Sequence, residues 1–242
     1  MGVVYKKLLW FNKFSDLFYV ILHLKAKHIE MADITAYRKE LKDRILLAAD
    51  EAFKRNGIKA VRMDDIANNL SISKRTLYEL FQNKEVLLFE TIKKTHADGE
   101  RNMKQYALQS NNVMDIVLHF LQLRIDEFGT INPLYFEEIH RYPEIVQFLK
   151  SNENSQRCHT LNFFERGVDE GFFRSDVNYE IVCQLNKASI DYIMRNQLYK
   201  EFPMTEIFRN LVMLNLRGCC TEKGIKALDL FSKNIICKSN LP

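Results

Sequence analysis

Glycine and proline are scarce in this sequence, with 8 Gly and 4 Pro among 242 residues. Folds made of many short strands need such turn residues often, so their scarcity disfavours those folds and favours long helices. Cysteine is also sparse: there are five, an odd number, and no two have the C-x-x-C spacing. We therefore expect reduced thiols in the cytoplasm, with no disulfide framework, no metal site and no cofactor.

No uninterrupted apolar run is long enough to span a membrane. The first thirty residues nevertheless carry the only tryptophan, Trp10, among bulky apolar side chains, and no small-residue cleavage site follows them. Three interpretations stay open: sequence upstream of a native start at Met31, an added amphipathic helix packed on the body, or an interfacial membrane anchor. We favour the first, so residues 1–35 are expected to be an N-terminal extension without stable membrane association.

Positive charge is concentrated in one segment. Residues 36–84 hold 11 Lys/Arg and 7 Asp/Glu, a net charge of +4, whereas residues 85–242 hold 19 and 21, a net charge of −2. A basic segment ahead of a slightly acidic body suggests a polyanionic partner such as nucleic acid.

Apolar residues recur at three- and four-residue intervals along most of the chain, which predicts an all-α fold without strands or repeats. The predicted helices cover residues 40–56, 63–70, 74–81, 84–106, 113–128, a short segment from 133, 143–171, 178–199, 205–217 and a last helix from 221 onward. We expect a three-helix domain over residues 36–84 and a larger helical domain over residues 85–242.

The segment SISKRTLYELFQNK, residues 71–84, predicts a helix-turn-helix. Ser73 is a good N-cap, but a helix this short needs tertiary packing to be stable. The residues expected to clamp it onto the two preceding helices are Ile66, Leu70, Ile72, Leu77 and Phe81. A short helix seated in this way, with basic and hydroxyl groups at its start, is the layout of a DNA-reading helix.

Each polar group at the start of this helix has an expected role. Arg75 can donate two hydrogen bonds to guanine O6 and N7, which reads sequence. Lys74, Thr76 and Tyr78 are better placed for phosphates, which fix register. Lys84 adds a charge at the start of the next helix. A solvated basic helix end is the alternative for any one of these residues.

The stretch ILLAADEAFKRNGIKAVRMDDIANNLSISKRTLYELFQNKEVLL resembles the DNA-binding domain of the TetR family of transcriptional regulators. The matching positions are Ala48, Ala49, Phe53, Gly57, Ile66, Ala67, Ile72, Ser73, Thr76, Leu77, Tyr78, Phe81, Lys84 and Glu85. The resemblance implies that residues 73–78 lie on the recognition helix, and that Tyr78 and Lys84 contact phosphates.

This sequence also departs from the family pattern. Arg62 stands where Ser or Thr usually caps the second helix, so that cap is lost or replaced, and Arg62 becomes available for a phosphate contact. Ser71 replaces a common turn glycine, Arg75 a common small residue and Leu80 a frequent Tyr or His, so relatives do not predict the operator. The full set of predicted DNA-binding residues is Arg62, Ser73, Lys74, Arg75, Thr76, Tyr78 and Lys84.

For the larger domain, the resemblance implies effector binding and dimerisation. It places the homodimer contacts on the helices near residues 178–199 and 204–218, although these faces can equally complete the monomer core. The predicted dimer contacts are Ile190, Ile193, Phe208, Val212 and Leu216. The predicted contacts of an unknown small-molecule effector, apolar or aromatic in character, are Phe89, His96, Phe120, Tyr135, Phe136, Phe148, Phe163 and Tyr192.

The sequence therefore predicts a ligand-responsive repressor that binds a palindromic duplex operator as a homodimer. Effector binding is expected to shift the helix that starts near Lys84 and so change the separation of the two recognition helices. Alternatives are a helical protein- or membrane-interaction module anchored by residues 1–30, and an enzyme with its site in the helical body. The enzyme is disfavoured because the sequence has no G-x-S-x-G, phosphate loop or metal motif.

Overall fold

The computed structural model describes residues 35–155 and 157–239, and their side chains except for 152–159 and 233–239. The predicted N-terminal extension up to residue 34, including Met31, lies outside the described residues, as do the side chains of Cys158, His159 and Cys237. The chain divides into two units, one ending at Leu47 and the other starting at Ala48. In the first unit residues 35–47 are helical, and every element named below belongs to the second.

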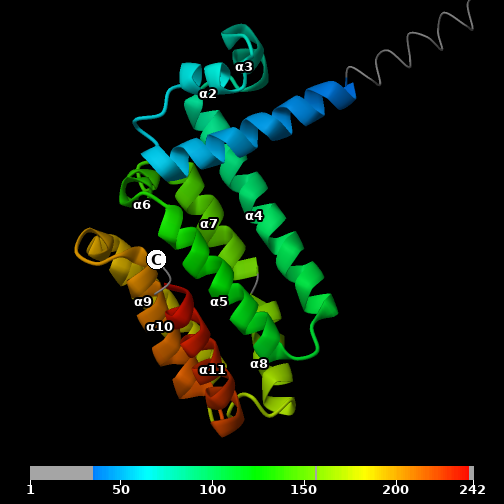
Figure 1. The fold of residues 1–242 in the computed structure, drawn as a ribbon, viewed down its shortest axis with the longest axis vertical. Helices are drawn as coiled ribbons and strands as arrows, with labels where there is room; N and C mark the ends of the chain where they lie inside the picture. The colour runs from blue at the N-terminus through cyan, green and yellow to red at the C-terminus, as the bar shows by residue number, and fades with distance from the viewer. Residues whose placement is uncertain (1–34, 156, 240–242) are drawn as a thin grey trace, which may run out of the picture. The chain divides into compact units, whose positions relative to one another are not determined.

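The second unit is all-α in its described part, as the hydrophobic periodicity predicted (Figure 1). Residues 48–56 are helical and precede the short helices α2 and α3 and a larger set of helices. The elements are α2 Met63–Asn69, α3 Lys74–Leu80, α4 Lys84–Gln109, α5 Val113–Thr130, α6 Pro133–Ile139, α7 Pro143–Ser155, α8 Arg157–Asp169, α9 Tyr179–Arg195, a 3-10 turn Leu198–Lys200, α10 Met204–Cys219 and α11 Glu222–Ser239.

Side-chain caps fix where several of these helices begin. At the starts of α3, α4, α5 and α6 a side-chain oxygen accepts a backbone N–H that the helix itself leaves unpaired. These capping residues, with their donor–acceptor distances, are Ser73 at 3.0 Å, Asn83 at 2.9 Å, Asn112 at 2.9 Å and Asn132 at 2.9 Å. The sequence therefore located these boundaries to within a few residues.

Two elements cover the region in which one helix was expected over residues 143–171. These are α7 and α8, which lie on either side of residue 156 and together reach Asp169. Helix α9 ends at Arg195 rather than near residue 199, because Gln197 adopts a left-handed conformation with φ of 55° before the 3-10 turn.

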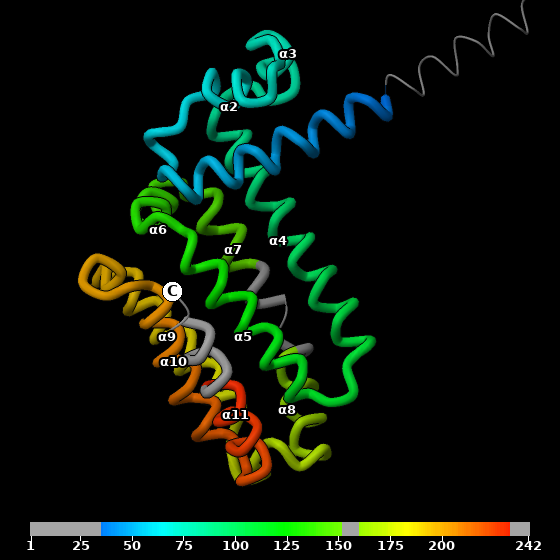
Figure 2. The backbone as a smooth tube through the Cα atoms, in the orientation of Figure 1, coloured from blue at the N-terminus to red at the C-terminus, as the bar shows by residue number. Residues whose placement is uncertain are grey.

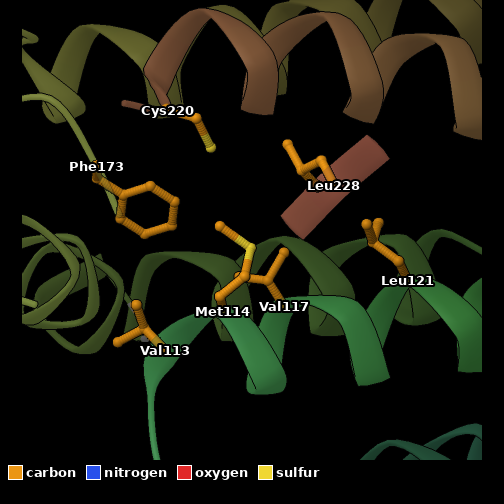
Figure 3. Packing of buried hydrophobic residues seen from close by; sticks show 7 residues of the cluster. All are labelled: Val113, Met114, Val117, Leu121, Phe173, Cys220 and Leu228. Atoms are coloured by element: carbon orange, nitrogen blue, oxygen red, sulfur yellow. The ribbon is translucent and has the colours of Figure 1, made fainter. Parts of the chain in front are cut away.

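Helix α5 is the centre of the larger domain, since it contacts α4, α8, α10 and α11 (Figure 2). Its inner face contributes to a buried apolar cluster shown in Figure 3. The cluster residues are Val113, Met114, Val117, Leu121, Phe173, Cys220 and Leu228. The nearby Gly167 must lack a side chain, because a Cβ there would lie 2.1 Å from the Phe173 ring. This close packing joins α5, α8 and α11 in one apolar core.

Candidate nucleic-acid interface

Helix α3 is held on α2 by its apolar side. Leu77 and Phe81 are buried, as is Ile66 of α2, while Leu70 and Ile72 are half-buried. The turn between the helices is tight: Ser71 adopts φ of 53°, and the N–H of Ile72 donates to the carbonyl of Ala67 at 3.0 Å. The predicted packing of the apolar side of α3 on α2 is therefore confirmed, and it leaves the opposite side of α3 exposed.

The polar residues predicted at the start of α3 share that exposed side. The Ser73 hydroxyl caps the helix by accepting the N–H of Thr76, and the two hydroxyls are hydrogen-bonded to each other at 2.7 Å. Lys74, Arg75 and Tyr78 are exposed. The structure thus brings Ser73, Thr76 and three longer side chains together on one short element.

Both cations at the start of α3 are engaged by carboxylates. Lys74 Nζ lies 2.5 Å from Asp64 Oδ2 of α2, and Arg75 Nε donates to Glu79 Oε1 one turn later at 2.8 Å. Hydrogen bonding to Asp64 raises the pKa of Lys74. Neither ion pair was predicted from the sequence, although the i,i+4 spacing of Arg75 and Glu79 is typical of such a pair.

Arg62 does not cap α2 with its side chain. Instead its backbone N–H donates to Asp65 Oδ2 at 2.9 Å, which is the reverse half of a capping box. The guanidinium of Arg62 is exposed. The loss of the usual cap is therefore offset by Asp65, and the predicted phosphate contact of Arg62 stays a prediction.

Lys84 has a structural role that the sequence did not reveal. Its ammonium donates to the carbonyls of Lys59 at 3.2 Å and Val61 at 2.7 Å, in the segment before α2. Burial lowers the pKa of Lys84, while the charges of Glu138 and Asp65 oppose that shift. An ammonium has three donors, so one remains for the predicted phosphate contact.

A second group of polar contacts links residues 54–59 to α5 and α6. Lys54 pairs with Glu127 at 3.0 Å, and its carbonyl accepts the N–H of Asn132 at 2.7 Å. The buried Glu138 of α6 accepts the backbone N–H of Lys59 at 2.6 Å. The segment leading to α2 is therefore attached to the larger domain by ionic and backbone hydrogen bonds.

The predicted effector contacts fall into separate places. Phe89, His96 and Phe148 form one aromatic group between α4 and α7, with ring centroids 5.7 and 5.8 Å from Phe148. A second group runs through α5, α6 and α10, and consists of Phe120, Phe128, Tyr135, Phe136 and Phe208. Phe163 packs against the Phe173 cluster, and Tyr192 is exposed. The abundance of Phe and Tyr in the sequence could not show which of these aromatic residues lie together in the fold.

The predicted dimer contacts also lie in different surroundings, some exposed and some packed inside the protomer. Ile190 is exposed, but Ile193 is buried in the protomer. Phe208, Val212 and Leu216 pack on the cluster at α5, so they lie on the inner side of α10. The exposed or half-buried apolar residues on the other sides of α9 and α10 are Ile181, Leu185, Ala188, Tyr192, Ile207, Leu211 and Leu214.

Among the described residues, no helix is long and apolar enough to cross a membrane. No group of three or more His, Cys, Asp and Glu side chains among them is arranged to hold a metal ion.

A family model described as bacterial regulatory proteins, tetR family, matches residues 45–91. That match contains α2, α3 and the start of α4. No curated protein matches the sequence.

Solved structures share the fold at low identity. A TetR-family regulator from Agrobacterium tumefaciens is 15% identical, with a TM-score of 0.59 over 76% of this chain and 100% of its own. A transcriptional regulator from Saccharomonospora viridis in complex with choline is 18% identical, with the same TM-score and the same coverage of both chains. The regulatory protein TetR from Rhodobacter sphaeroides is 14% identical, with a TM-score of 0.56 over 72% and 96%. The family match therefore identifies residues 45–91 as a helix-turn-helix segment of the tetR family of bacterial regulatory proteins, and the chain as a whole shares the fold of solved regulators of this kind.

Proposed function

We propose that this regulator is a ligand-responsive repressor that binds a palindromic operator as a homodimer, and that it has no enzymatic activity. Residues 36–84 bind DNA, and residues 85–242 bind the effector and form the dimer. The observation that carries the proposal is the α2–α3 arrangement, in which a buried apolar side seats α3 and leaves its polar start exposed. Such a protein acts in the cytoplasm, where its DNA target lies.

DNA contacts divide between sequence reading and positioning. Arg75 is the proposed reader, because a guanidinium can donate two hydrogen bonds to guanine. Arg62, Lys74 and Tyr78 position the helix by contacting phosphates, with the capped N-terminus of α3 and the remaining donor of Lys84. Thr76 and Ser73 contribute mainly by fixing the first turn of α3.

The outward sides of α9 and α10 support the dimer. On α9, Ile181, Leu185, Ala188 and Tyr192 follow a spacing of four, three and four residues. On α10, Ile207, Leu211 and Leu214 repeat the first two of those intervals. The two helices contact each other, and Asn215 donates to Asn186 across them at 2.8 Å. Two adjacent apolar stripes of this spacing suit packing against the same pair in a second copy.

The effector site belongs to the larger domain. Its two aromatic groups supply the apolar, ring-lined surroundings in which small molecules commonly bind. The Saccharomonospora viridis relative, which was solved with choline, supports a small-molecule effector for this fold.

The polar contacts around Lys54, Lys59 and Lys84 are the proposed route by which the effector acts on DNA binding. They attach the segment before α2 to α4, α5 and α6. An effector that prefers a shifted arrangement of these helices would move the reading helix away from its position on the operator. A preference of a few kcal/mol between the two states is sufficient.

Selection of genomic DNA fragments by the purified full chain tests the function directly. We expect enrichment of an inverted repeat whose half-sites lie about one helical turn apart, because a symmetric dimer presents two reading helices to consecutive major grooves. Recovery of fragments without any shared sequence would contradict the proposal.

A further inference from the structure

The helix-turn-helix of α2 and α3 carries little positive charge of its own. Residues 63–80, which span α2, the turn and α3, contain two basic residues, Lys74 and Arg75, and three acidic ones, a net charge of −1. Each cation is paired with a carboxylate of the same element or its neighbour, Asp64 or Glu79. All four side chains are exposed, and they lie on the elements proposed to bind DNA.

Such carboxylates oppose binding to any phosphate backbone. A duplex attracts Lys and Arg whatever its sequence, and this attraction supplies most of non-specific binding. A carboxylate beside the cation repels the phosphates and competes with them for the same donors. Because an exposed ion pair is weak, it reduces this attraction without preventing the cation from contacting DNA.

The geometry of the Arg75 pair favours one kind of contact. Glu79 accepts from Nε, which leaves the two terminal nitrogens of the guanidinium without that partner. Guanine presents O6 and N7, two neutral acceptors that suit a pair of parallel donors. Glu79 also favours conformations in which the Arg75 side chain extends along α3, which reduces the conformational entropy lost on binding.

We propose that Glu79 and Asp64 are specificity-determining positioning residues, which suppress sequence-independent DNA binding and direct Arg75 to a guanine in each half-site. This inference rests on the proposed operator binding. It assigns no DNA contact to either carboxylate: Glu79 acts through Arg75, and Asp64 acts through Lys74.

The test compares full-length Glu79→Gln and Asp64→Asn with the wild-type protein. Both changes keep the size of the side chain and remove its charge. Affinity is measured by fluorescence anisotropy over a salt series, for the selected operator and for a random-sequence duplex of equal length. Glu222→Gln is the matched control, because Glu222 forms the same i,i+4 pair with Lys226 at 2.9 Å and lies in α11, away from α3 (Figure 1).

We expect each variant to bind the random duplex about threefold to tenfold more tightly than the wild type, with a salt slope steeper by about one. The ratio of operator affinity to random-duplex affinity falls correspondingly, most for Glu79→Gln, while Glu222→Gln leaves it unchanged. Thermal unfolding followed by circular dichroism verifies that all variants are folded.

Two outcomes separate this inference from the function on which it rests. If the wild-type protein selects an operator but both variants keep its affinity ratio and salt slope, the carboxylates do not set specificity and the operator binding stands. If the wild-type protein selects no sequence, both fail.

Discussion

Lys84 illustrates how one side chain can serve both folding and DNA binding. Its ammonium donates to two carbonyls in the segment before α2, at Lys59 and Val61. Substituting Lys84→Met retains the aliphatic stem and removes these bonds. We expect the free energy of unfolding in urea to fall by about 1.5–3 kcal/mol, since hydrogen bonds to charged groups contribute at that level.

The control for this change is Lys93→Met on the same helix, where the ammonium pairs with the half-buried Glu90 at 3.2 Å and lies 5.4 Å from the centroid of the Phe89 ring, which a methionine side chain can still contact. A surface pair of this kind contributes little, so unfolding should change by less than about 0.5 kcal/mol. Equal stability of Lys84→Met and the wild type would show that the carbonyl contacts do not hold this segment.

At the scale of single residues, the helix-capping residues could be predicted from the sequence, but the hydrogen-bond partners of Lys84 could not. The caps at Ser73 and Asn83 follow from local chemistry and were readable. The carbonyl partners of Lys84 were not, because they lie 23 and 25 residues away and depend on how the helices pack. Asp65 stabilises the start of α2 in another way, because its carboxylate accepts the backbone N–H of Arg62 three residues earlier.

At the scale of elements, the turn at Gly57 ends the helix of residues 48–56 and directs the chain toward α2. Gly57 has φ of +82°, and a Cβ there would lie 3.1 Å from Leu134 Cβ and 3.3 Å from Glu138 Oε2. Gly57→Ala should therefore lower the free energy of unfolding by about 1–2 kcal/mol, through backbone strain and crowding of α6.

Gly99 provides the opposite case within α4. It is helical, and a Cβ there would meet nothing within 4 Å. Gly99→Ala should stabilise the protein by about 0.5–1 kcal/mol, because alanine is the better helix former. Chemical denaturation gives the free energy of unfolding of both variants. If Gly57→Ala and Gly99→Ala change it equally, the turn does not require glycine at position 57.

The ion pair between Lys54 and Glu127 of α5 should make the free energy of unfolding depend on pH. Burial alone would raise the pKa of Glu127, but the hydrogen bond and charge of Lys54, with a contribution from Arg124, hold that pKa below its ordinary 4.5. A lowered folded-state pKa gives stability that is present above pH 4.5 and is lost as pH falls through the folded-state value.

Glu127→Gln should consequently cost about 1 kcal/mol at pH 7 and less below pH 4, measured as the difference in urea unfolding from the wild type. Asp126→Asn is the control, since Asp126 accepts only from Gln122 at 2.8 Å on the exposed side of α5. A cost for Glu127→Gln that is the same at both pH values would argue against the pairing.

Helices could be predicted from the sequence where a local feature, such as apolar periodicity or a capping residue, marks them. The all-α class and the starts of α3 to α6 follow from periodicity and caps. The side that α10 turns inward was not predictable, because its apolar residues surround most of the helix. Phe208, Val212 and Leu216 suit either a core or a dimer surface by spacing alone. In the protomer they pack, partly buried, against the cluster at α5, and their dimer contacts stay a prediction.

At the scale of the whole molecule, the proposed dimer depends on the outward stripes of α9 and α10. Leu185 is 60% exposed in the middle of the α9 stripe, so Leu185→Glu places a charge in the proposed interface without disturbing the core. We expect light scattering with size-exclusion chromatography to give a dimeric mass for the wild type and a monomeric mass for this variant, with unchanged helix content.

Leu108 offers the comparison, because it is 81% exposed near the end of α4 and lies on neither stripe. Leu108→Glu should remain dimeric and bind the operator normally. A dimeric Leu185→Glu protein would place the subunit contact elsewhere.

Arg75, at the exposed start of α3, is the residue proposed to read a base in the major groove. A cycle of measured affinities that combines Arg75→Ala with replacement of each base pair in the selected half-site tests this role. We predict that one guanine is coupled to Arg75: replacing either partner costs about 1–3 kcal/mol, and replacing both costs little more than replacing one. Losses that add at every base pair, leaving the sequence preference of Arg75→Ala identical to that of the wild type, would contradict the account.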